Sequence, residues 1–376
     1  MKITEEMLTY IKAHEKEAYE LLITLAQIPA PSLHEEKRAT FCKNWLEAQG
    51  AQGVYIDEAK NVVYPIGCEG DGPIAVFMAH SDVVFPDTEP LPLRVEDGKI
   101  FCPGVGDDTA NVVALLMAAK YLTEKHLKPH VGLLLVVNSG EEGLGNLKGS
   151  RKIMEDFGSR VTEFITFDGG ARALSNRAVG SKRYRVEIRT EGGHSYNNFG
   201  NRNAIAYLAS LIETLYAVEI PPKGKTTYNV GVIEGGTSVN TIAEEAHMLY
   251  EFRSDERESL LYMERQFQAA VDLYRAKGVD VSVTLVGERP CMGDVDEEKQ
   301  QNLSLRGAEA IRRYYEHEPC FKSGSTDCNV PLSMGIPSLC VGCLLGGGAH
   351  TRSEFVYTDS LLPGLMAAFD LVLHHV

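Results

Sequence analysis

The residues of this 376-residue chain with the clearest potential for chemistry are histidines and carboxylates that follow apolar runs or glycine-rich turns. A mixed set of imidazole and carboxylate groups suits Zn²⁺, with Co²⁺ and Mn²⁺ as alternatives. Two cations held close together also need a carboxylate whose two oxygens can each bind one ion. The sequence offers two histidines and three carboxylates for such a pair: His80, Asp107, Glu142, Asp168 and His350.

Two further carboxylates adjoin these residues. Asp82 follows His80 on the same side of an extended segment, where it can accept the other imidazole N–H and orient the ring. Glu141 precedes Glu142, and neighbouring residues of an extended chain point to different sides. We therefore expect Glu141 to face water beside the cations and to act as the general base. Taken singly, each residue is more typical of a structural histidine, a solvated loop or a cap, so the prediction depends on their meeting in space.

Buried strands and helices alternate in the part of the chain that carries these residues. The runs 74–79, 131–137 and 164–167 are apolar without alternation, which is typical of strands covered on both faces. Helices are expected near 149–157 and from Asp107 onward, which places the aspartate pair at a helix N-terminus. This alternation predicts a mainly parallel α/β sheet, in which ligands bind beyond the carboxyl ends of the strands.

A second domain is indicated between residues 178 and 288. Tyr184 to Arg189 alternates polar and apolar residues like a half-exposed antiparallel strand. The elements expected from there follow the order β-α-β-β-α-β, which is a ferredoxin-like α+β arrangement. We therefore expect a discontinuous catalytic domain made of residues 1–177 and 289–376, with residues 178–288 inserted into it.

Composition argues against several classes of partner and location. The formal net charge of −15 offers no basic face for nucleic acid or anionic lipid. The first residues lack the pattern of a signal peptide, and no apolar segment reaches the length of a membrane span. Eight cysteines at irregular spacing indicate a reduced, cytoplasmic protein. Cys340 and Cys343 have the spacing of a redox pair, but their apolar surroundings favour a core strand.

Five motifs, in order along nearly the whole chain, resemble the M20 family of metallopeptidases. They are Met78 to Val84, Gly106 to Asp108, Ser139 to Gly143, Phe167 to Gly169 and Gly348 to Thr351. The resemblance implies that His80, Asp107 and Asp168 bind one zinc ion and that Asp107, Glu142 and His350 bind a second. It also implies that Asp107 bridges the ions and is joined to Asp108 by a cis peptide bond. Glu141 would be the general base and Asp82 the partner of His80.

The resemblance extends into the inserted domain, which it implies to be a lid and dimerisation domain. Glu191 to Ser195 resembles a loop whose histidine, here His194, reaches the active site of the partner in a homodimer and stabilises the oxyanion. Asn240 and Arg253 resemble residues that contact the carbonyl and the carboxylate of the substrate, with ordinary loop or strand chemistry as the alternative. Gly324 to Asp327 resembles a segment lining the pocket, although we expect Asp327 to cap a helix.

The function implied by this resemblance is hydrolysis of amide bonds in small peptides, most similar to tripeptidase T-type aminopeptidases. A water that bridges the metals would attack the carbonyl while Glu141 moves the proton. Asp168 favours a peptidase, since glutamate is more frequent there among the deacylases of the family. The alternatives are an N-acyl amino acid deacylase with the same site, a non-catalytic binding protein that retains the fold, and a thiol redox protein. A non-catalytic binding protein would lack at least one metal ligand or the general base, and neither is missing in this sequence.

Overall fold

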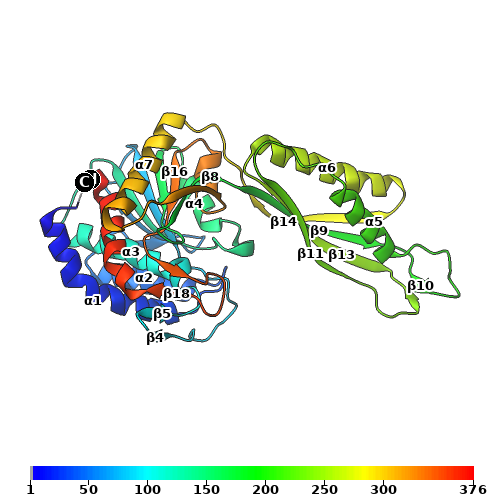
Figure 1. Ribbon diagram of the computed structural model, residues 1–376, viewed down its shortest axis with the longest axis horizontal. Helices are drawn as coiled ribbons and strands as arrows, with labels where there is room; N and C mark the ends of the chain where they lie inside the picture. Colours follow the sequence, from blue (N-terminus) through cyan, green and yellow to red (C-terminus); the bar gives the residue numbers. More distant parts are fainter. Residues whose placement is uncertain (1–2) are drawn as a thin grey trace. The chain divides into compact units, whose positions relative to one another are not determined.

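The structure is a computed structural model that describes residues 3–376 and divides into two compact units (Figure 1). One unit contains the chain up to Ala178 together with Asp294–Val376, and the other is Val179–Gly293. The second unit extends beyond residue 288 because its last strand, β14 (Asp280–Arg289), remains paired as far as Arg289.

The first unit is built on an eight-stranded sheet with the order β1-β2-β6-β3-β7-β16-β8-β15. The pairs β3–β6, β3–β7, β7–β16 and β8–β15 are parallel, whereas β1–β2, β2–β6 and β8–β16 are antiparallel. The prediction of a mainly parallel α/β sheet is therefore confirmed. The strands are β1 (Tyr55–Ile56), β2 (Val62–Ile66), β3 (Ile74–His80), β6 (Gly132–Asn138), β7 (Val161–Thr166), β8 (Ala173–Ala178), β15 (Cys320–Gly324) and β16 (Ser338–Val341).

Helices cover this sheet so thoroughly that every residue of β3 and β6 is buried. Helices α1, α3, α7 and α9 contact one another and share a hydrophobic core with Phe77 and Ile165 of the sheet. No described helix is both long and apolar enough to cross a bilayer. The helices of this unit are α1 (Glu5–Gln27), α2 (Glu36–Ala48), α3 (Ala110–Glu124), α4 (Lys148–Phe157), α7 (Glu297–Tyr314), α8 (Asn329–Ser333) and α9 (Leu361–Val372).

A small antiparallel sheet in the same unit has the order β17-β18-β5-β4 and joins segments far apart in the sequence. Its pairing of β18 with β5 brings the chain just after His350 beside the chain just before the Asp107 turn. Its strands are β4 (Arg94–Glu96), β5 (Lys99–Phe101), β17 (Gly346–Gly347) and β18 (Phe355–Tyr357).

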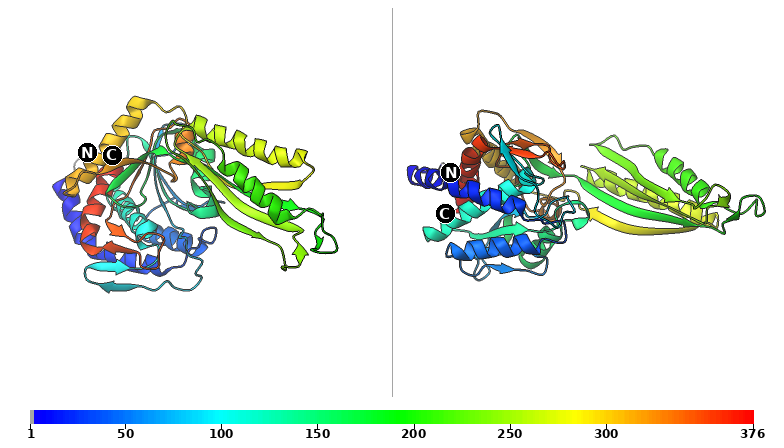
Figure 2. Two further views of the ribbon diagram at one scale, coloured as in Figure 1. Left: turned by 45° about the vertical axis from the view of Figure 1, so that its right-hand side comes forward. Right: turned by 90° about the horizontal axis from the view of Figure 1, so that it is seen from below.

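The second unit is an antiparallel sheet with the order β11-β13-β9-β14. Its elements follow the expected β-α-β-β-α-β order, and both helices lie on the same side of the sheet (Figure 2). Alternate strand residues such as Val186 and Met248 pack against Leu208 and Phe267 of these helices. The elements are β9 (Gly180–Arg189), α5 (Ala204–Tyr216), β11 (Thr226–Gly235), β13 (Glu245–Ser254), α6 (Arg257–Ala276) and β14, with a short pair formed by β10 (Gly193–His194) and β12 (Thr241–Ile242).

Candidate metal centre

Three adjacent strands of the main sheet, β6, β3 and β7, bring four of the predicted site residues together at their carboxyl ends. His80 is the last residue of β3 and pairs with Asn138, the last residue of β6, which is followed closely by Glu141 and Glu142. Strand β7 ends at Thr166, shortly before Asp168. Because these strands are parallel, their carboxyl ends lie on the same side of the sheet.

The side chains of the five predicted ligands form two overlapping groups. Ligand atoms of His80, Asp107 and Asp168 lie within 4.8 Å of one another, and so do those of Asp107, Glu142 and His350. Asp107 belongs to both groups. Its Oδ1 lies 3.0 Å from His80 Nε2, and its Oδ2 lies 3.2 Å from His350 Nε2. His350 Nε2 is also 3.0 Å from Glu142 Oε1.

These distances fit a pair of divalent cations. Metal–ligand bonds of 2.0–2.1 Å in tetrahedral geometry place neighbouring ligand atoms about 3.3 Å apart, close to the separations in this cluster. Each oxygen of Asp107 faces a different histidine, which is the arrangement that a carboxylate bridging two ions requires. The set of two imidazoles and three carboxylates is also the donor chemistry of Zn²⁺, Co²⁺ and Mn²⁺.

Burial and neighbouring charges shift the pKa values of the residues in this cluster. Burial alone would lower the pKa of His80, but the charge of Asp108 and a hydrogen bond with Asp107 raise it well above its usual value. A hydrogen bond with Asp107 raises the pKa of His350 to about 9. Burial raises the pKa of Glu142 to about 8, with Asp107 adding to the shift and His80 opposing it. These shifts reflect how closely the charged groups of the cluster lie to one another.

Asp107 lies in a tight turn rather than at a helix N-terminus. The peptide bond between Asp107 and Asp108 is cis, as the family resemblance implied. Asp107 has non-helical torsions (φ −123°, ψ 86°), and α3 begins only at Ala110, so the expected helix start at Asp107 is wrong.

A residue distant in the sequence, Glu354, binds the backbone of this turn. The buried Glu354 carboxylate accepts hydrogen bonds from the backbone N–H groups of Gly104, Gly106 and Asp107 at 2.8, 2.8 and 2.7 Å. Local sequence gives no sign of this contact, because Glu354 belongs to the segment that follows His350.

Asp82 connects the end of β3 to the loop that carries the two glutamates. Its carboxylate accepts the backbone N–H groups of Glu141 and Glu142, both at 3.0 Å, and the hydroxyl of Ser32 at 2.7 Å. His80 Nδ1 lies 3.0 Å from the backbone carbonyl of Asp82 and 3.4 Å from its carboxylate. Asp82 therefore orients both the imidazole and the glutamate loop.

The same loop is held from the N-terminal segment of the chain. The buried Glu35 accepts the N–H of Gly140 at 3.1 Å. Ser32 and Glu35 were not identified as site residues from the sequence, because both precede the first metal motif by more than forty positions.

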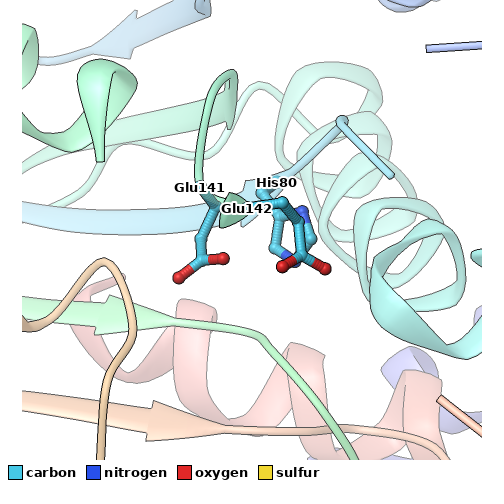
Figure 3. A group of neighbouring side chains, drawn as sticks. All are labelled: His80, Glu141 and Glu142. Atoms are coloured by element: carbon cyan, nitrogen blue, oxygen red, sulfur yellow. The ribbon is translucent and has the colours of Figure 1, made fainter. Parts of the chain in front are cut away.

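Glu141 and Glu142 direct their carboxylates to different places (Figure 3). Glu142 lies with His80, whereas the Glu141 carboxylate extends away from the ring, although both glutamates and the histidine offer ligand atoms within 4.8 Å of one another. Both side chains are buried. The arrangement leaves Glu142 facing the ligand cluster and Glu141 beside it.

Asp327 does not cap a helix. Cys328 stands at the N-cap of α8 without a side-chain cap, and the Asp327 carboxylate instead accepts Asn138 Nδ2 at 2.6 Å. Burial raises the pKa of Asp327 to about 8, with the charge of Glu141 adding to the shift. The expected cap is wrong because a tertiary contact with the end of β6 takes the carboxylate.

In the second unit, His194 and Asn240 lie beside each other where β10 pairs with β12. His194 of β10 pairs with Thr241, and the N–H of Ser195 donates to the carbonyl of Asn240 at 2.9 Å. His194 Nδ1 accepts the backbone N–H groups of Tyr196 and Asn197 at 3.2 and 3.4 Å. A neutral His194 therefore carries its proton on Nε2, which can act as a donor. The Asn240 side chain accepts the hydroxyl of Ser238 at 2.7 Å.

Arg253 lies at the opposite end of the sheet in this unit. Its guanidinium donates two hydrogen bonds of 3.0 Å to the carboxylate of Glu251. It pairs with Ser181 at the start of β9, whereas β10, which carries His194, follows the end of β9. The strand from Glu245 to Arg253 spans roughly 25 Å at about 3.3 Å per residue. Within one chain, His194 and Arg253 are therefore too far apart to contact the same small molecule.

The thiol redox alternative is wrong. Cys340 and Cys343 are buried, and burial raises the pKa of both thiols well above the usual value. A reactive thiol needs an accessible, acidified sulfur, and neither residue provides one.

The chain is similar to several known proteins. Uncharacterised protein YqjE of Bacillus subtilis is 27% identical, and the match covers 93% of this chain and 95% of that protein. A succinyl-diaminopimelate desuccinylase of Nitrosomonas eutropha is also 27% identical, over 49% of this chain and 53% of the relative. The structure of a tripeptidase from Staphylococcus aureus has the same fold, with a TM-score of 0.75 and 21% identity over 96% of this chain and 99% of that one.

A family model matches the chain from residue 76 to residue 374. It is described as peptidase family M20/M25/M40, and the matched segment contains all five predicted ligands and Glu141. The protein therefore belongs to peptidase family M20/M25/M40 and is a metallopeptidase-type hydrolase.

Proposed function

We propose that this protein is a di-zinc aminopeptidase that cleaves small peptides. The observation that carries the proposal is Asp107, whose two oxygens lie 3.0 and 3.2 Å from His80 and His350. His80, Asp107 and Asp168 would hold one cation, and Asp107, Glu142 and His350 the other. Co²⁺ or Mn²⁺ would fit the same ligands.

Glu141 is the general base in this mechanism. When bound, the cations polarise the scissile carbonyl and make water more acidic. Glu141 takes the proton of the attacking water and then delivers it to the leaving amine. Asp82 holds the Glu141 backbone and the His80 ring, so it fixes the relative position of base and ligand.

A homodimer would complete the site through the second unit. His194 Nε2–H would donate to the developing oxyanion, and Asn240 would contact the substrate carbonyl, both from the partner. Arg253 would bind the substrate carboxylate. Exposed apolar side chains on α5 and on the edge strand β11 support self-association, among them Ile205, Tyr216 and Ile233.

The second candidate function is deacylation of N-acyl amino acids. Relatives named succinyl-diaminopimelate desuccinylase and acetylornithine deacetylase match about half of the chain. The peptidase is favoured because the structure named as a tripeptidase matches over nearly the full length. All eight cysteines are free thiols, which supports a cytoplasmic location as part of this proposal.

A substrate comparison tests the proposal. Purified protein loaded with Zn²⁺ is assayed against free tripeptides, the same tripeptides with a blocked N-terminus, and N-acetyl and N-succinyl amino acids. An aminopeptidase cleaves only the free tripeptides, because the blocked ones lack the terminal ammonium. Cleavage of the N-acyl amino acids alone would establish the deacylase instead. Metal analysis of the same samples should give two ions per chain.

A further inference from the structure

Arg38 of α2 is an arginine buried deep in the first unit, with 1% of its surface exposed. Its Nε donates to the carbonyl of Ile28 at 2.7 Å. Its Nη1 donates both to the carbonyl of Ser81 at 2.9 Å and to the hydroxyl of Thr109 at 3.0 Å. A single nitrogen thus spans two separate segments of the chain.

Those two segments bring the first ligands of the metal centre together. Ser81 lies between His80 and Asp82 at the end of β3, and Thr109 follows the Asp107–Asp108 pair. The Thr109 hydroxyl also donates to the carbonyl of Gly104 at 2.6 Å, which closes the turn around Asp107. Arg38 therefore joins the Asp107 turn to the end of β3, in addition to the hydrogen bond of 3.0 Å that the His80 N–H donates to the Asp108 carboxylate.

Burying a guanidinium at this place is unfavourable. Removing a charge from water is unfavourable when its hydrogen-bond partners are neutral. Burial lowers the pKa of Arg38 to about 10, although the charges of Asp82 and Glu354 oppose the shift. A positive charge beside the cation site would also repel the cations. Neither effect favours metal binding, so what remains for Arg38 to contribute is geometry.

We propose that Arg38 is a positioning residue of the metal centre. It holds the end of β3 and the Asp107 turn so that His80 and Asp107 are close enough to share a cation before the cation binds. The proposal rests on the proposed function of the site, but it concerns metal affinity rather than turnover. It predicts that metal affinity requires the several hydrogen bonds of the Arg38 guanidinium and not its positive charge.

The test measures Zn²⁺ affinity of the metal-free protein by competition with a chromophoric chelator, for wild type, Arg38→Lys and Arg38→Met. Arg38→Lys keeps the charge but presents one nitrogen on a flexible stem, so affinity should fall about 10- to 100-fold. The visible absorption of the Co²⁺-loaded protein should change as well, since the ligand geometry is altered. Arg38→Met should lose at least as much affinity.

Arg160→Lys is the matched control. Arg160 donates to the carbonyls of Gly72 and Cys68 at 2.9 and 2.8 Å, near the opposite end of β3 from His80. Arg160→Lys therefore removes an arginine that donates to two backbone carbonyls, as Arg38→Lys does, but at a place away from the candidate ligands. We expect Arg160→Lys to keep wild-type Zn²⁺ affinity and the wild-type Co²⁺ spectrum.

Wild-type affinity in Arg38→Lys would overturn the proposal, and so would tighter binding in Arg38→Met, which would indicate charge repulsion alone. If Arg38→Lys does not fold, Thr109→Val and Thr109→Ser decide the question. Thr109→Val removes the acceptor of Arg38 and should weaken Zn²⁺ binding, whereas Thr109→Ser retains the hydroxyl and the affinity. Equal affinity in both would again contradict the proposal. Failure of the proposed function would appear separately, as wild-type protein that binds Zn²⁺ but cleaves no peptide.

Discussion

At the scale of single residues, the centre depends on side chains that each perform one geometric task. Asp107 directs one oxygen to His80 and the other to His350. His350 itself has a left-handed backbone (φ 62°), which is uncommon outside glycine and asparagine and places its ring toward Asp107 and Glu142. The candidate ligand His350 is therefore held by backbone geometry as well as by side-chain contacts.

The base and its neighbouring ligand should be separable by mutation. Glu141→Ala should retain both cations and lose about a hundredfold or more in kcat, because the ligand cluster of Glu142 is untouched while the proton acceptor is gone. Steady-state kinetics with metal analysis measures this. Glu142→Ala, the adjacent control, should lose metal content. Turnover at the wild-type rate in Glu141→Ala would remove that residue from the mechanism.

At the scale of elements, buried charges join segments that the sequence separates widely. Glu163 of β7 accepts hydrogen bonds from Arg306 of α7 and from His375 near the C-terminus. Burial alone would raise the pKa of Glu163, but the hydrogen bond with His375 and the charge of Arg306 lower it to about 2. This carboxylate therefore connects the first half of the central strand β7 to α7 and to the C-terminal segment. The contact lies near the amino ends of the parallel strands, away from the metal centre.

The Glu163 contact predicts an acid-sensitive part of the stability. Glu163 has a pKa of about 2 in the folded protein, below the value near 4.5 in the unfolded chain. The ionised carboxylate therefore stabilises the fold fully above pH 4.5, and this contribution is lost as the pH falls toward 2. The shift corresponds to roughly 3 kcal/mol. Glu163→Gln should thus lower the unfolding free energy of the metal-free protein at pH 6, and its difference from wild type should shrink between pH 4.5 and 2.

Denaturant unfolding across that pH range measures the effect. Glu318→Gln is the control, because Glu318 forms an exposed pair with Arg312, and such pairs contribute little. A constant difference between wild type and Glu163→Gln at every pH would contradict the assignment.

At the scale of the whole molecule, the two units carry different parts of the proposed reaction. The cation ligands and Glu141 belong to the first unit, and His194, Asn240 and Arg253 to the second. His194 and Arg253 lie at opposite ends of β9 and β13. A single substrate can meet both residues only if they come from two chains.

Mixed dimers test this division. Glu141→Ala and His194→Ala should each be nearly inactive, with both cations still bound. Co-expression of the two variants should recover about a quarter of the wild-type activity, because half of random dimers are mixed and each mixed dimer has one intact site. A mixture without recovery would place His194 in the site of its own chain, and unchanged kinetics of His194→Ala alone would refute the oxyanion role.

Much of the fold and the clustering of the candidate ligands could be predicted from the sequence, because both follow from local patterns. Unbroken apolar runs identify strands covered on both faces, and parallel strands necessarily gather their carboxyl ends at one edge. His80, Glu142 and Asp168 could therefore be assigned to one place before any coordinates. The change to alternating polar and apolar residues near 180 likewise indicated the second unit.

Only the tertiary structure decided how the ligands are held. Glu354 contacts Gly104 across 250 positions of the chain, and Arg38 reaches Thr109 across 71, so neither contact leaves a trace in local periodicity. Asp327 was expected to cap a helix because its neighbours suit one, yet a residue of another strand takes its carboxylate. Local sequence determines which side chains lie at the carboxyl ends of the parallel strands. The distances within the site depend on buried hydrogen bonds between segments that only folding brings together.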